Sequence, residues 1–307
     1  MHIDKNLLAR FEAGLNPQNL EASPISATVL GFGEISTVFE IGGDSALAYK
    51  RMPLFSDRAS AEKYAQQHLE YCGFLKEAGL RLPENETAIM EPSNGPVVLY
   101  IAQEQLVPQR FGHKLIHSLD AQDIERVIQG IVSEIAKVRQ FNESCRPRME
   151  LALDGQLSNW VCFERGKGLQ IYYVDTSTPL YRKDGIEQLD PELFLRSAPF
   201  FLKWIIRFLF LDQVMERYYD QRQIYLDLAA NLYKEQQPGL VPLTIQVING
   251  ALPADLEPIT AREVEKYYKE DKLIWTLFLA FRRLDCWIKT KLFRKQYEFI
   301  IPGRIER

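Results

Sequence analysis

Two acidic residues and an amide near the middle of the chain have the types and spacing needed for work on a metal-bound phosphate. Asp154 and Asn159 stand five residues apart in L-A-L-D-G-Q-L-S-N-W, after a helical pattern and before a strand. At this spacing both side chains can point into one site, where the carboxylate accepts a hydroxyl proton and the amide oxygen ligates a metal. Asp175 ends the apolar run I-Y-Y-V, where a hard cation would find an oxygen. Ordinary turns would explain the two aspartates but not Asn159.

A glycine-bearing loop and a lysine earlier in the chain add groups that suit phosphate. Gly31, Gly33 and Ser36 lie in G-F-G-E-I-S-T-V, between two expected strands. Glycines let backbone N–H groups approach phosphate oxygens closely. The strand–loop–strand context excludes a Walker loop and a dinucleotide fingerprint, because both of those open a helix. Lys50 falls inside the next strand, where a buried ammonium needs a partner or a ligand. A plain hairpin and an edge lysine are the alternatives for each feature alone.

Taken in chain order, these segments resemble the protein-kinase superfamily. The loop follows G-x-G-x-x-G-x-V with Ser36 at the third glycine, and Lys50 matches the lysine of V-A-I-K. Asp154 and Asn159 match D-x-x-x-x-N, and Asp175 matches the aspartate of D-F-G.

The rest of the chain indicates which branch of this superfamily the sequence resembles. It covers residues 29–178, and no A-P-E segment follows. Bulky helical patterns begin soon after Pro179. This organisation is more similar to the aminoglycoside phosphotransferase and choline kinase branch, whose helical insertions bind small substrates.

The resemblance implies ATP and Mg²⁺ as cofactors. Lys50 would hold the α- and β-phosphates, Asn159 and Asp175 would hold the metal, and Asp154 would be the base. The segment from Gln103 to Leu106 would form the hinge that meets the adenine.

The resemblance also implies a glutamate partner for Lys50 on the following helix. Glu70 is the first choice, because Phe74, one turn on, would face the sheet from the same side. Glu62 is the alternative.

Three departures from the family pattern bear on activity. Ala152 replaces the histidine of H-x-D, Gln156 stands where a lysine is frequent, and Thr176-Ser177 replaces Phe-Gly. The proton acceptor and both metal ligands remain. We therefore expect a phosphotransferase acting on a hydroxyl of a small molecule, with a nucleotide-binding pseudokinase, a regulatory or interaction module, as the alternative. The acceptor and the preference for ATP or GTP stay open.

The elements expected around these residues predict an α+β, two-lobed, protein-kinase-like fold. Its first lobe, residues 1–105, would hold a small antiparallel sheet with one main helix, and its second, residues 106–307, would be mostly helical. Hydrophobic periodicity predicts a short helix in the first twenty residues that ends before Pro17, and helices over 57–78, 120–141, 191–196, 199–219, 223–234 and 261–293. Short apolar runs predict strands over 27–31, 38–41, 46–52 (ended by Pro53), 97–102, 160–163 and 169–174, and residues 237–258 are expected to form an irregular connection.

Composition excludes several classes of protein. The 307 residues are 46% hydrophobic and 25% charged, as in ordinary globular proteins, and a net charge of −4 gives no reason to expect nucleic acid. The four cysteines are far apart, which indicates neither a thiolate metal site nor a disulfide framework. The longest apolar segment, 199–211, contains Lys203 and Arg207 and falls short of the roughly 20 residues of a membrane span. We expect a buried helix there and a cytoplasmic protein.

The last stretch, residues 273–307, is basic and amphipathic. Its cations outnumber its three carboxylates, and large apolar side chains lie between them. The expected arrangement is a helix that packs its apolar face on the helical lobe with its cations outward. Contact with an anionic membrane is the alternative.

Overall fold

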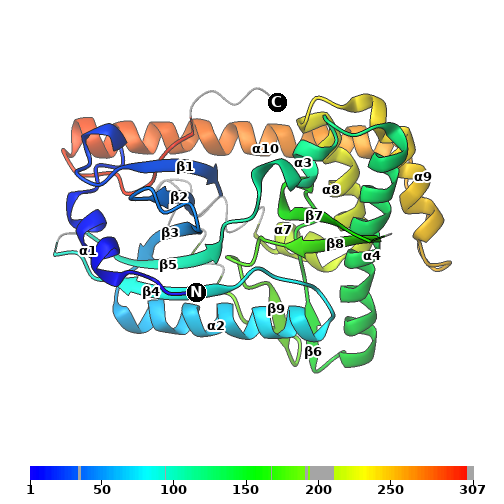
Figure 1. Ribbon diagram of the computed structural model, residues 1–307, viewed down its shortest axis with the longest axis horizontal. Helices are drawn as coiled ribbons and strands as arrows, with labels where there is room; N and C mark the ends of the chain where they lie inside the picture. Colours follow the sequence, from blue (N-terminus) through cyan, green and yellow to red (C-terminus); the bar gives the residue numbers. More distant parts are fainter. Residues whose placement is uncertain (34–35, 94, 167, 191–192, 194–210, 303–307) are drawn as a thin grey trace.

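The computed structural model describes residues 1–33, 36–93, 95–166, 168–190, 193 and 211–302. Within them the fold is α+β, with one five-stranded sheet, two smaller groups of strands and many helices. Figure 1 shows the larger sheet on one side of the molecule and most of the helices gathered on the other.

The larger sheet is antiparallel, with the strand order β1-β2-β3-β5-β4. Alternate residues of each strand point to opposite faces of the sheet. Helix α1 covers one face, and helix α2 covers the other. On β5, Tyr100 packs in the cluster that contains α1, and Leu99 and Ile101 pack in the cluster that contains α2. The elements of this region are α1 (Lys5–Gly14), β1 (Ala27–Phe32), β2 (Thr37–Ile41), β3 (Leu47–Phe55), α2 (Arg58–Glu77), β4 (Asn85–Met90) and β5 (Val97–Glu104).

The remainder of the chain is mostly helical. A buried stripe on α4 includes Ile124, Ile128, Ile131 and Ile135, and Asp120 caps the start of this helix by accepting from the Asp123 amide. The helices are α3 (Gly112–Leu115), α4 (Ala121–Cys145), α7 (Leu211–Tyr219), α8 (Gln221–Lys234), α9 (Val241–Ala251) and α10 (Ala261–Trp287). The strands are β6 (Met149–Leu151), β7 (Trp160–Arg165), β8 (Gly168–Tyr173), β9 (Tyr181–Lys183) and β10 (Ile186–Glu187).

Helix α10 joins the two regions. In Figure 1 it runs from the helices α8 and α9 to the end of the sheet near β1. The chain after it returns against the sheet, where Gln18 Nε2 donates to the carbonyl oxygens of Tyr297 and Phe299 at 3.1 and 3.2 Å. The C-terminal segment is therefore part of the sheet's packing.

The helices and strands expected before residue 190 are all present. Among the boundaries that differ, β3 continues through Pro53 to Phe55. Its pairing with β5 shifts register between Met52 and Phe55. Such an irregularity accommodates a residue that has no N–H to donate.

The irregular connection expected over residues 237–258 is wrong, since α9 occupies Val241–Ala251. Pro242 lies in the first turn, where its missing N–H costs nothing. Val241, Thr244 and Ile248 form the buried face. The expected helices over 191–196 and 199–219 lie outside the described residues, apart from Leu193 and Leu211–Tyr219.

A buried ion pair ties the sheet to α1 and to the C-terminal segment. Arg51 Nε lies 2.6 Å from Glu12 Oε1, and both side chains are 4% exposed. The guanidinium also donates to the Glu298 carbonyl oxygen at 2.8 Å, and Tyr100 OH donates to Glu12. Each charge is therefore satisfied only while α1, β3 and the C-terminal segment stay together.

We expect Arg51→Ala to lower the free energy of unfolding by about 3–5 kcal/mol, because it leaves the Glu12 carboxylate buried without its cation. Urea denaturation followed by circular dichroism measures this loss. Arg10→Ala is the matched control, since it removes an exposed cation from α1 and should change stability by no more than about 0.5 kcal/mol. Equal losses in the two variants would contradict the prediction.

Candidate functional site

Lys50 lies in β3 and reaches the segment that follows β8. Its Nζ donates to the Val174 carbonyl oxygen at 3.0 Å and to Ser177 Oγ at 3.4 Å, and it pairs with Asp175 Oδ1 at 3.3 Å. The lysine is 8% exposed, so the carboxylate and these oxygens must offset the loss of water around its charge. Two residues 125 positions apart thus meet in one site.

One side of the Asp175 carboxylate remains open. Lys50 and Ser177 Oγ both contact Oδ1, the latter at 3.1 Å. Among the described residues no hydrogen bond to Oδ2 occurs, and the side chain is 31% exposed. An oxygen of Asp175 is therefore available to a ligand.

Asn159 lies beside Asp175 at the entrance to β7. The Val174 amide donates to the Asn159 carbonyl oxygen at 2.9 Å, which places Asn159 next to the Val174-Asp175 backbone. The Asn159 Nδ2 donates to the Asp154 carbonyl oxygen at 3.3 Å. This bond uses a donor of the amide and leaves its Oδ1 as an acceptor.

Asp154 is held in place through its backbone and its carboxylate. Its amide donates to Tyr173 Oη at 3.1 Å. The backbone amide of Gln156 donates to Asp154 Oδ1 at 3.0 Å, and the Gln156 side chain donates to Oδ2 at 3.3 Å. The loop therefore fixes the direction in which the carboxylate points.

Helix α2 turns aromatic and imidazole side chains toward the Asp175 segment. Tyr64 OH donates to the Ser177 carbonyl oxygen at 2.8 Å, and His68 Nδ1 lies 2.9 Å from the Thr176 carbonyl oxygen. Tyr71 is buried on the same face. Residues four and seven apart share one side of a helix, so this is the face that meets the site.

The expected pairing of Lys50 with a helix glutamate is wrong. Glu70 pairs instead with Lys183, at 2.5 Å, and Glu62 pairs with an arginine of its own helix at 2.7 Å. Glu70 is two residues from His68, which rotates it by about 200° around the helix and away from Lys50.

His68 is a neutral group in this position. Burial, with a smaller effect of the nearby charge of Lys50, lowers its pKa to about 4, although the hydrogen bond with the Thr176 carbonyl oxygen acts in the opposite direction. At neutral pH the His68 side chain of α2 therefore adds no charge beside Lys50, neither an anion nor a second cation.

The two expected hinge residues differ in their surroundings. Gln103 is 4% exposed, and its side chain donates to Thr176 Oγ1 at 2.9 Å, so the side chain points into the interior. The amides of Glu104 and Gln105 donate to carbonyl oxygens just before β4 and β3. Leu106 is half-buried, and within the described part of the chain its amide makes no hydrogen bond. Of the two, Leu106 is thus the residue whose backbone amide is left open to a ligand.

The glycine loop joins β1 and β2 at the edge of the sheet. Gly31 pairs with Val38, which in turn pairs with Lys50, so the loop adjoins the lysine's strand. The Gly33 amide donates to the Ser36 carbonyl oxygen at 2.9 Å. A Cβ on Gly33 would lie 3.0 Å from Ser36 Oγ, a close approach that a small shift of this serine side chain would relieve.

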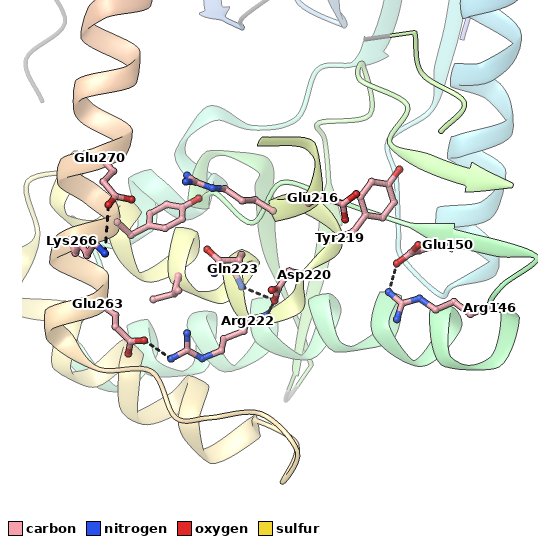
Figure 2. Close-up of a pocket in the computed structure, with 13 residues that line it drawn as sticks. Arg146, Glu150, Glu216, Tyr219, Asp220, Arg222, Gln223, Glu263, Lys266 and Glu270 are labelled. Atoms are coloured by element: carbon pink, nitrogen blue, oxygen red, sulfur yellow. Dashed lines mark hydrogen bonds and ion pairs between the residues drawn. The ribbon is translucent and has the colours of Figure 1, made fainter. Parts of the chain in front are cut away.

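A cavity of about 530 Å³ opens between α7, α8 and α10 (Figure 2). Most of its lining side chains are charged, and several are paired with one another, such as Arg222 of α8 with Glu263 of α10 at 2.7 Å. Tyr267 lines this cavity and also a smaller void that Gln156 and Asp227 border. The cavity is therefore one side chain away from the surroundings of Asp154.

Comparison with known proteins identifies the family. A model described as "Family of unknown function (DUF6206)" matches residues 21–286. The chain belongs to this family. No curated protein matches it. A solved structure titled "WaaP in complex with acyl carrier protein" aligns with a TM-score of 0.36 and 11% identity, over 81% of this chain and 91% of that chain. A likeness this slight supports no conclusion about function.

Two side chains of α8 complete the site of this DUF6206 protein, and the sequence analysis missed both. Asp227 lies within hydrogen-bonding reach of Asp154, and Lys234 Nζ donates to Gln156 Oε1 at 2.6 Å. They are two helical turns apart and share a face. The available signal was an aspartate inside the apolar run L-D-L-A-A, where a charge needs a partner.

The Asp227 carboxyl has an unusual electrostatic environment. Burial, and then the nearby Asp271, raise its pKa to about 6, whereas Lys234 and the hydrogen bond with Asp154 act in the opposite direction. The folded protein therefore holds the proton of Asp227 to a higher pH than the unfolded chain does.

A raised pKa in the folded state gives stability that is complete below the unfolded value, near 4, and is lost as pH rises through about 6. We expect the free energy of unfolding of the wild type, relative to Asp227→Asn, to fall between pH 4 and pH 7, because the amide never ionises. Urea denaturation across this range measures the difference. Asp255→Asn, at a side chain that is 69% exposed, is the control and should run parallel to the wild type. A constant difference for Asp227→Asn would contradict the assignment.

Proposed function

We propose that the chain is an ATP-dependent phosphotransferase that moves the γ-phosphate to a hydroxyl of a small molecule. The observation that carries this proposal is the 3.3 Å contact between Lys50 and Asp175, with Asn159 and Asp154 on the adjoining loop. A cation for phosphate, two oxygen ligands and a proton acceptor are thereby neighbours. Phosphoryl transfer depends mainly on positioning and on charge stabilisation, and this set supplies both.

The proposed fold is protein-kinase-like and two-lobed. Residues 1–105 would form the nucleotide-binding lobe, and 106–307 the lobe that holds the loops and the acceptor. Backbone amides of the loop from Gly31 to Ser36 would cover the phosphates, since the loop adjoins the strand of Lys50. The Leu106 amide would meet the adenine, and Gln103 would close the back of the cleft through Thr176.

The residues present fit a magnesium ion. Mg²⁺ prefers oxygen ligands, and the Asn159 amide oxygen and the second Asp175 carboxylate oxygen are the acceptors left open on two segments that a backbone hydrogen bond joins. The ion would neutralise charge on the transferring phosphate. Lys50 would add its charge to the α- and β-phosphates while Asp175 holds the ammonium in place.

Asp154 would act on the acceptor. The acceptor oxygen forms a bond to the γ-phosphorus while the bond from phosphorus to the β–γ bridging oxygen breaks, so that ADP leaves with the bridging electrons. The hydroxyl proton passes to the Asp154 carboxylate and from there to water. Gln156 would orient this carboxylate, because it donates to both oxygens.

The acceptor would occupy the cavity between α7, α8 and α10 (Figure 2). Its volume of about 530 Å³ suits a small molecule. Its charged lining suits a polar molecule with several hydrogen-bonding groups. The Tyr267 side chain would lie between this molecule and the surroundings of Asp154.

A nucleotide-binding pseudokinase is the second candidate, and one observation favours it. The Asp154 carboxylate already accepts from Gln156 on both oxygens and lies within reach of Asp227, so its proton-accepting capacity is partly used. Such a protein would bind ATP-Mg and act as a regulatory module without transfer.

Separate effects on binding and turnover test the proposal. We expect Asp154→Asn to lower ATP turnover by about 10²–10⁴-fold, as loss of a general base does, while the thermal shift given by ATP-Mg survives. Lys50→Met should lose the thermal shift as well, because it removes the phosphate's cation. A screen of small hydroxylated acceptors with detection of ADP measures turnover.

Glu70→Gln is the matched control. It should leave both binding and turnover at the wild-type level, since Glu70 pairs with Lys183 and not with Lys50. Full turnover in Asp154→Asn would refute the assigned base. Binding of ATP-Mg with no turnover on any acceptor would favour the pseudokinase.

A further inference from the structure

Helix α10 leaves a row of large apolar side chains in solvent. Leu273, Leu277, Leu284 and Trp287 are 60%, 46%, 44% and 57% exposed. At 100° per residue these four positions fall within about 80° of the helix circumference, along about 21 Å of its length. The expected helix that packs its apolar face on the helical lobe holds at the start of α10, where Val264 is buried, but is wrong for these four side chains.

The opposite face of the same helix accounts for its place in the fold. Leu279, Arg282 and Asp285 are buried there. The Arg282 guanidinium lies 4.8 Å from the centre of the Phe299 ring. Asp285 pairs with Lys289 at 2.8 Å. Packing on this inner face holds α10 in position, so the outer row is not needed to attach the helix.

Beyond Leu273 the surface around the row is positive, whereas Glu270, one turn before it, is an exposed carboxylate. Between Lys272 and Tyr297 the only carboxylate in the sequence is Asp285, which is 1% exposed. Lys291, Arg294 and Lys295 are exposed just beyond the row. Leu292 and Phe293, which are 66% and 56% exposed, lie among these cations and extend the apolar surface.

We propose that this surface binds an anionic lipid bilayer. An apolar row edged by cations is the surface that lies in a membrane interface, with its leucine and tryptophan side chains at the acyl boundary and its cations at the phosphates. No helix of the described residues is long and apolar enough to cross a bilayer, so α10 would lie parallel to the membrane plane. In Figure 1 the helix extends along one edge of the molecule.

Charge complementarity favours a bilayer over a second copy of the chain. An identical surface carries the same cations, so two copies would bring like charges together around the apolar row. An anionic headgroup layer offers the opposite charge and an apolar interior at once.

Co-sedimentation of the full chain with lipid vesicles tests this proposal. We expect binding to mixed phosphatidylcholine–phosphatidylserine vesicles, weaker binding to pure phosphatidylcholine, and a decrease as salt is added. The triple variant Leu277→Ser, Leu284→Ser, Trp287→Ser should bind at least about tenfold more weakly, because it removes the row. The double variant Lys291→Glu, Lys295→Glu should lose binding to a similar degree.

The matched control has the same change in charge elsewhere. Lys5→Glu with Lys63→Glu alters two exposed lysines on α1 and α2, outside the surface, and should bind as the wild type does. Circular dichroism and the urea midpoint check that each variant is folded.

Three outcomes would overturn the proposal. The first is wild-type binding that does not depend on phosphatidylserine. The second is full binding by the serine variant, which would mean that cations alone adsorb the protein. The third is a wild type that is dimeric in solution and becomes monomeric in the serine variant, which would assign the row to a second copy.

Discussion

An ammonium taken out of water must meet an anion, and for Lys50 that anion comes from the far end of a separate hairpin. The lysine is carried by the sheet and Asp175 by the segment after β8, so their 3.3 Å contact exists only when the sheet and the helical region are assembled. The Val174 carbonyl and Ser177 hydroxyl take the other bonds of the ammonium. Because Val174 also pairs with Asn159, this contact sets the distance between the lysine and the loop that bears Asp154.

The absence of a glutamate partner changes the electrostatics around Lys50. Among the described residues, the carboxylate of Asp175 pairs with the Lys50 ammonium, and α2 places the neutral His68 nearby. When a lysine pairs with two carboxylates, two negative charges offset its positive charge. Lys50 pairs with one carboxylate, so more of its positive potential remains to attract a phosphate. His68 instead supports the backbone, because its ring lies against the Thr176 carbonyl oxygen. The helix thus positions the segment from Val174 to Ser177 and leaves the lysine's charge unaltered.

Much of the arrangement could be predicted from the sequence because it depends on local patterns. The stripe on α4, the cap at Asp120 and the β7–β8 hairpin each follow from residues close together in the chain. The order of Lys50, Asp154 and Asp175 indicated one site, and the ion pair between the first and the last agrees with that.

The predictions that were wrong or missing concern the direction in which a side chain points from its helix, or contacts between elements that are far apart in the sequence. Glu70 and His68 are two residues apart, and periodicity alone did not show which of them faces Lys50. Asp227 approaches Asp154 only because α8 packs under the loop, where a Cβ on Gly155 would lie 2.8 Å from Ile224. Contacts across 70 residues are set by how the elements pack, and no short motif records that.

Helix α10 shows how one element can serve two surfaces without conflict. Its first turns line the cavity beside Asp154 through Glu263, Tyr267 and Glu270, and its last turns hold the C-terminal segment against the sheet through Arg282. A rigid helix of about 40 Å transmits position along its length. The inner face of α10 is anchored at both ends. Anything bound to its outer side would therefore lie at a fixed distance and orientation from the cavity. If that object is a bilayer, the cavity has a defined height above it, and geometry alone then limits which acceptors can reach Asp154.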